Sequence, residues 1–109
     1  MTIAEGLYRA QFATPLGQGS GVVYFAGGTV GGGDSMMAYT GTLEESADDG
    51  IRATIRVFKH TDVPGMQTVL GTDTATLNFT GSQNGSGAIN LTATNPGGGS
   101  VSVALTQIA

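Results

Sequence analysis

The chain has 109 residues, a formal net charge of −4 and no cysteine. The lack of cysteine excludes a disulfide framework and a thiolate metal site. Its four lysine and arginine residues are too few to form the basic surface that neutralises nucleic-acid phosphates, which excludes direct nucleic-acid binding. The length predicts a single domain over residues 1–109.

Residues 1–12 contain neither the basic segment nor the apolar segment of a secretory signal. No apolar run approaches the roughly 18 residues that a membrane-spanning helix requires. We therefore expect a soluble, cytoplasmic protein with no membrane partner.

Apolar residues recur with a period of two along most of the chain, which is the pattern of half-buried β-strands. Gly6–Thr14 begins this series, and residues 51–58 show the clearest alternation. The expected strands cover residues 6–14, 18–26, 29–32, 36–45, 51–58, 74–80, 89–94 and 101–106. The longer connection at 59–73 contains Met66 and Leu70, and we expect it to fold back onto one end of the sheet, as a short strand or a helical turn.

The stretch 27–41, read GGTVGGGDSMMAYTG, is unusually rich in glycine. A phosphate-binding loop would need Gly-Lys-Ser/Thr at the start of a helix, and neither the lysine nor a helical pattern occurs here. The glycines therefore predict tight turns, and Gly27-Gly28 is a two-residue hairpin signal.

A sharp corner between two strands is predicted at Gly32, Gly33 and Asp34. The side chain of Asp34 is expected to accept hydrogen bonds from backbone N–H groups of this turn. Tyr39 and Gly41 then belong to the strand that leads into an acidic turn. We interpret the whole stretch as architectural.

The strand count predicts an all-β fold, because eight strands close into a barrel that holds side chains or one small ligand. Closure also removes the exposed sheet edges that strands rich in threonine and poor in charge leave unprotected. A small antiparallel β-barrel of about eight strands is therefore expected. An open sandwich of two sheets fits the same pattern.

The acidic turn contains four of the chain's eight carboxylates, on Glu44, Glu45, Asp48 and Asp49. Their spacing differs from that of an EF-hand calcium loop, which requires oxygen ligands at alternating positions. Clustered charges of one sign steer a basic partner toward a surface. The turn is therefore either a solvated hairpin loop or a surface that binds a partner.

Phe58 and Met66 are candidates for a dimer interface or another apolar contact, because Phe58 falls on the polar face of its strand. His60 is the single histidine, and only Asp62 lies near it in sequence as a second metal ligand. We expect a solvated histidine, no metal, no cofactor and no catalytic residue.

Five short motifs occur in a characteristic order: Gly6-Leu7-Tyr8, Phe12, Gly19-Ser20-Gly21, Gly32-Gly33-Asp34 and Tyr39-Thr40-Gly41. In this order the chain resembles the GrlR family, bacterial negative regulators of type III secretion gene expression. The resemblance is closest over residues 6–45 and continues more loosely through Val57 and residues 64–71.

This resemblance implies a lipocalin-like barrel that forms a homodimer and binds another protein. In the type member of the family the bound protein is a transcriptional activator, which is held away from DNA. The family has an acidic loop where Glu44 to Asp49 lies here, which implies a role in partner binding for these carboxylates.

Three functions remain open from the sequence. The leading hypothesis is a non-enzymatic regulator whose acidic turn binds a basic surface on another protein. The alternative is a small-molecule carrier or sensor, because the inward positions of Gly41, Ala53, Ala75 and Ala93 are small and leave room inside a barrel. An enzyme has no support beyond one histidine and several carboxylates.

Overall fold

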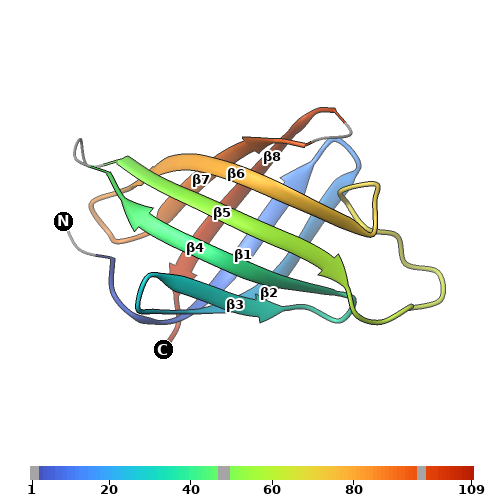
Figure 1. Ribbon diagram of the computed structural model, residues 1–109, viewed down its shortest axis with the longest axis horizontal. Coiled ribbons are helices and arrows are strands. Elements are labelled where there is room, and N and C mark those ends of the chain that lie inside the picture. The colour runs from blue at the N-terminus through green and yellow to red at the C-terminus, as the bar shows by residue number, and fades with distance from the viewer. Residues whose placement is uncertain (1–2, 47–49, 96–97) are drawn as a thin grey trace.

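A computed structural model describes residues 3–46, 50–95 and 98–109. Each strand is antiparallel to the next along the chain, and β1 also pairs with β8, so the sheet closes into a barrel (Figure 1). The prediction of a small all-β barrel is confirmed, and the open sandwich is wrong. The strands are β1 (Gly6–Thr14), β2 (Gly17–Ala26), β3 (Thr29–Gly33), β4 (Met37–Glu45), β5 (Gly50–Lys59), β6 (Thr74–Gln83), β7 (Ile89–Thr94) and β8 (Ser100–Gln107).

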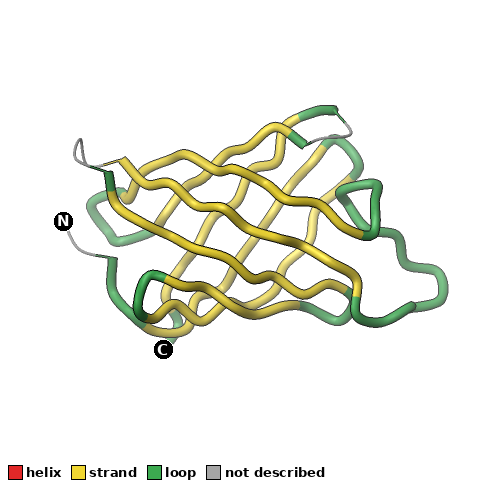
Figure 2. Tube along the Cα trace, in the orientation of Figure 1, coloured by secondary structure: helices red, strands yellow, loops and turns green. Residues whose placement is uncertain are grey.

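The loops gather at the two ends of the barrel, and the strands run between them (Figure 2). We call the end with the loops that follow β1, β3, β5 and β7 the mouth. The other end, with Ile3, Ala109 and the loops that follow β2, β4 and β6, is the floor. Among the described residues there is no helix, and hence none that is long and apolar enough to cross a membrane.

The alternation predicted from the sequence defines the inner face of the barrel. In β5 the inward residues are Ile51, Ala53, Ile55 and Val57, as expected, and they pack in the core with apolar residues from the other strands. The core arises because every strand turns alternate side chains to one side. Closure brings those sides together around one axis.

Three glycines, two in a hairpin and one in a strand, show why this barrel needs glycine. Gly27 and Gly28 have φ angles of 59° and 81°, which suit the two-residue hairpin predicted between β2 and β3. At Gly41 a Cβ atom would lie 1.9 Å from the carbonyl oxygen of Thr54 in the neighbouring strand. Glycine therefore lets β4 approach β5 more closely than any other residue would.

Candidate functional site

The barrel interior is hollow on the side of the mouth. A cavity of about 230 Å³ extends inward from the mouth, and nearly all the strand residues that line it are apolar. Normal protein interiors leave few voids larger than a water molecule, so this space exceeds the gaps that ordinary side-chain packing leaves. The inward strand residues around it are Ala10, Phe12, Val23, Val30, Met37, Tyr39, Leu43, Ala53, Ile55, Val57, Leu77, Phe79, Leu91, Val101, Val103 and Leu105.

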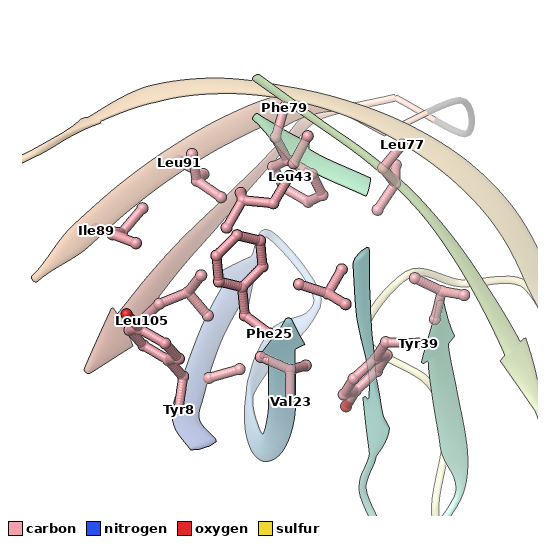
Figure 3. Close-up of a cluster of buried hydrophobic side chains, with 14 of the residues drawn as sticks. Tyr8, Val23, Phe25, Tyr39, Leu43, Leu77, Phe79, Ile89, Leu91 and Leu105 are labelled. Carbon is pink, nitrogen blue, oxygen red and sulfur yellow. The ribbon is translucent and has the colours of Figure 1, made fainter. Parts of the chain in front are cut away.

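The floor side of the barrel is filled. Ile89 is completely buried, and Ile3, Tyr8, Phe25 and Ile51 are almost completely buried, yet none of the five lines the cavity. Figure 3 shows Tyr8 and Ile89 on one side of the buried cluster and Tyr39 on the other. The side chains at the floor therefore close one end of the cavity.

Two aromatic rings form part of the cavity wall near the mouth. Phe12 and Tyr39 meet edge to face, with ring centroids 5.9 Å apart and planes at 78°. A Cβ atom on Gly19 would lie 2.5 Å from the Phe12 ring, and one on Gly21 would lie 3.1 Å from the Tyr39 ring. Each ring therefore packs over a glycine of β2. The glycines of β2 thus make room for the rings.

Asp34 organises the corner between β3 and β4 as expected. Its Oδ1 atom accepts hydrogen bonds from the backbone N–H groups of Met36, at 2.9 Å, and Met37, at 2.7 Å. Its Oδ2 atom accepts a hydrogen bond from the Tyr39 hydroxyl. Burial, followed by this hydrogen bond to Asp34, raises the pKa of Tyr39 well above its usual value, so the phenol stays protonated and donates.

Gly32 and Gly33, which precede this corner, are part of the β3 ladder. They pair with Tyr39 and Ala38 of β4, respectively, so the corner brings Asp34 close to the start of that strand. His60 also joins this corner, because its Nε2 atom lies 2.9 Å from the carbonyl oxygen of Asp34. The side chain of His60 is exposed, as the sequence predicted.

The connection between β5 and β6 covers the mouth. Residues 66–70, which we call the cap, line the cavity, and Leu70 is 7% exposed. Residues 66–69 also border an outer hollow of about 410 Å³, so the cap lies between the cavity and this outer hollow. The prediction that this connection folds back is confirmed, although it does so through turns and forms no strand or helix.

Two polar side chains, one at the end of β1 and one just after β7, hold the cap. The Thr14 hydroxyl donates to the carbonyl oxygen of Val69 at 2.5 Å, and the buried Asn95 side chain donates from Nδ2 to the carbonyl oxygen of Leu70 at 2.9 Å. Neither residue was predicted as part of a site. A polar residue at the end of a strand or just after it resembles many other turn-flanking residues, so the sequence holds no signal for these contacts.

Glu44 and Glu45, the described carboxylates of the acidic turn, end β4 at the floor, away from the cavity. Glu44 is exposed and faces Arg52 across the β4–β5 ladder. The Glu45 carboxylate accepts a hydrogen bond from the backbone N–H group of Ile3 at 2.5 Å, which holds the N-terminal segment against the barrel. Asp48 and Asp49 lie outside the described residues. Partner binding by these four carboxylates stays a prediction.

Phe58 and Met66 occupy different surroundings. Phe58 lies half-buried on the outer wall, where the guanidinium carbon of Arg56 is 4.6 Å from its ring centroid. Met66 belongs to the cap and is 50% exposed. Their role in a dimer stays a prediction, whereas the position of Met66 relates it to the cavity.

Comparison of the chain with models of known protein families and with curated proteins yields no match. The resemblance to the GrlR family and the functions that it implies therefore stay predictions.

Proposed function

We propose that this protein binds a small, largely apolar molecule inside its barrel, as a carrier or a sensor. The observation that supports this function is the cavity of about 230 Å³ with apolar walls. Ligand sites typically combine apolar walls with a few placed polar groups, and here the polar groups, including Asp34, lie at the mouth. A barrel interior packed to normal density would have contradicted this hypothesis.

The volume limits the size of the ligand. An engineered apolar cavity of roughly 150 Å³ accommodates benzene, whereas sites for drug-sized molecules begin at about 300 Å³. The cavity of about 230 Å³ lies between these values. A single ring with substituents or a medium-length alkyl chain therefore fits the available space.

The test uses the isoleucine methyl groups as internal reporters. Ile55 lines the cavity, whereas Ile3, Ile51 and Ile89 pack at the floor and Ile108 is exposed. Methyl-resolved NMR of protein labelled at isoleucine should show a saturable shift of the Ile55 signal on addition of octan-1-ol. The Ile108 signal should not move, and the floor signals should move less than that of Ile55. Equal shifts at all five methyl groups, or no saturable shift at Ile55, would contradict the proposal.

We infer as a second candidate the protein-binding role implied by the resemblance. The feature that favours it is the exposed carboxylate of Glu44, the first acidic residue of that turn, near the floor end of β4. A basic partner protein should then be retained by the wild-type chain in a pull-down from a bacterial lysate. Replacement of Glu44, Glu45, Asp48 and Asp49 by Gln and Asn should abolish this retention, and unchanged retention would exclude the acidic turn as the binding surface.

A further inference from the structure

We propose that the cavity selects amphiphiles whose head group is neutral or cationic and donates hydrogen bonds, such as primary amines and alcohols, and that it discriminates against carboxylates. This inference rests on the proposed function and names the ligand class. The first observation is the sign of the charges. All four lysine and arginine residues lie within the described part of the chain and none lines the cavity, whereas Asp34 does.

The four lysine and arginine side chains lie outside the cavity. Arg9, Arg52 and Arg56 are exposed on the outer faces of β1 and β5. Lys59 lies at the rim, in the outer hollow, where its ammonium group pairs with Asp62 at 2.7 Å and with Asp73 at 3.3 Å. The mouth thus carries three carboxylates against one ammonium group among the described residues, and the ammonium group is already paired.

The second observation is the hydrogen-bonding state of Asp34. A carboxylate offers about four lone-pair sites. Three are occupied, by the N–H groups of Met36 and Met37 on Oδ1 and by the Tyr39 hydroxyl on Oδ2. The remaining site is on Oδ2, the oxygen that faces the inward side chain of Tyr39. It accepts a donor, such as an ammonium or hydroxyl group, and repels a carboxylate.

The apolar walls strengthen this selection. A charged head group that enters the mouth loses water, and only a partner of opposite charge compensates for that loss. The attraction or repulsion between head group and Asp34 is also larger near an apolar interior than in bulk water. The alkyl part of the ligand would occupy the cavity, where each buried CH₂ group adds to the affinity equally for every head group.

The experiment compares three probes with the same eight-carbon tail on the wild-type chain. Isothermal titration calorimetry at neutral pH should give the tightest binding for octylamine, weaker binding for octan-1-ol and the weakest for octanoate, with about tenfold or more between the first and the last. Ethylamine has the same head without the tail and controls for binding to the acidic surface. Octanoate binding as tightly as octylamine would overturn the inference, and so would ethylamine binding as tightly as octylamine.

A pair of variants at Met66 tests the selection by charge without changing Asp34, whose replacement could disturb the corner between β3 and β4. Met66→Lys places a base in the cap at a half-exposed position, and Met66→Gln is its neutral control of similar length. The lysine variant should bring the octylamine and octanoate affinities within about threefold of each other or reverse their order, whereas the glutamine variant should keep the wild-type order. An unchanged order in the lysine variant would overturn the inference. Failure of all three probes to bind would instead contradict the proposed function.

Discussion

The two ends of this barrel use the same strands and differ in what fills them. At the floor, Ile89 is 0% exposed and Tyr8 is 2% exposed, so this end resembles an ordinary hydrophobic core. At the mouth, the inward side chains surround a cavity of about 230 Å³, and a cap of non-repetitive structure covers it. A closed sheet therefore does not require a filled interior, because the strand hydrogen bonds are satisfied around the ring whether or not side chains meet at the axis.

The covers of the two ends are also built differently. The floor is covered by the apolar side chain of Ile3, which a hydrogen bond from its backbone to Glu45 holds in place. The cap at the mouth depends on two hydrogen bonds from Thr14 and Asn95 to its carbonyl oxygens. We expect the floor to provide stability and the mouth to open, because segments with fewer apolar contacts open at lower free energy.

The largest expected loss of stability comes from shortening a buried side chain at the filled floor. Ile89→Ala should lower the free energy of unfolding by about 4 kcal/mol, since it removes a fully buried side chain and leaves a new cavity. Ile55→Ala, the same change at the hollow end, should cost about 2 kcal/mol or less because its side chain already lacks neighbours on the cavity side. Urea unfolding followed by circular dichroism measures both values, and equal losses would contradict the difference between the ends.

Release of the cap should have an intermediate effect. Asn95→Ala leaves the Leu70 carbonyl oxygen without this side-chain donor, which should cost about 2 kcal/mol if the oxygen stays buried. Hydrogen exchange should become faster at the amides of the cap while those at the floor remain protected. Asn90→Ala, at an exposed position of β7, is the matched control and should leave exchange at the cap unchanged.

Filling the hollow end should change the free energy of unfolding by a smaller amount and should abolish ligand binding. Ala53 lines the cavity between Leu43 and Phe79 in the ladder, so Ala53→Leu would place three further carbon atoms in the empty space. We expect a gain of about 1 kcal/mol in the free energy of unfolding and loss of octan-1-ol binding. Ala104→Leu adds the same atoms on the outer face of β8 and should retain binding. Retained binding in Ala53→Leu would exclude this cavity as the site.

The smallest expected effect is a loss of stability at alkaline pH, and it concerns one tyrosine at each end of the barrel. Burial raises the pKa of Tyr8 at the floor, and burial together with the hydrogen bond to Asp34 raises that of Tyr39 at the mouth. Above the ordinary tyrosine pKa of about 10, the unfolded chain loses these protons while the folded chain keeps them. Stability is therefore fully present below about pH 10 and falls as the pH rises through it.

Tyr39→Phe should remove more of this alkaline loss than Tyr8→Phe, because the shift at Tyr39 is the larger. Urea midpoints measured between pH 8 and about pH 11 give the comparison. The same alkaline loss in wild type and Tyr39→Phe would show that the Tyr39 phenol is not protected in the folded state.

Local features of the sequence determined the strands and their faces. Alternation with a period of two placed Ile51, Ala53 and Val57 inward, and Gly27-Gly28 marked a hairpin, since both signals depend on neighbouring residues alone. The capping role of Asp34 also followed from its place in a turn, two and three residues before the N–H groups that it binds.

The tertiary structure alone decided that the sheet closes into a barrel and which part of the barrel interior stays empty. Closure depends on the pairing of β1 with β8, whose residues are about as far apart in the sequence as this chain allows. The sequence suggested spare room from four small inward residues, yet only Ala53 among them lines the cavity. Whether space remains depends on how side chains from many strands meet at the axis. It also depends on a cap whose carbonyl oxygens accept hydrogen bonds from Thr14 and Asn95, two residues far from it in the sequence. No local pattern encodes either outcome.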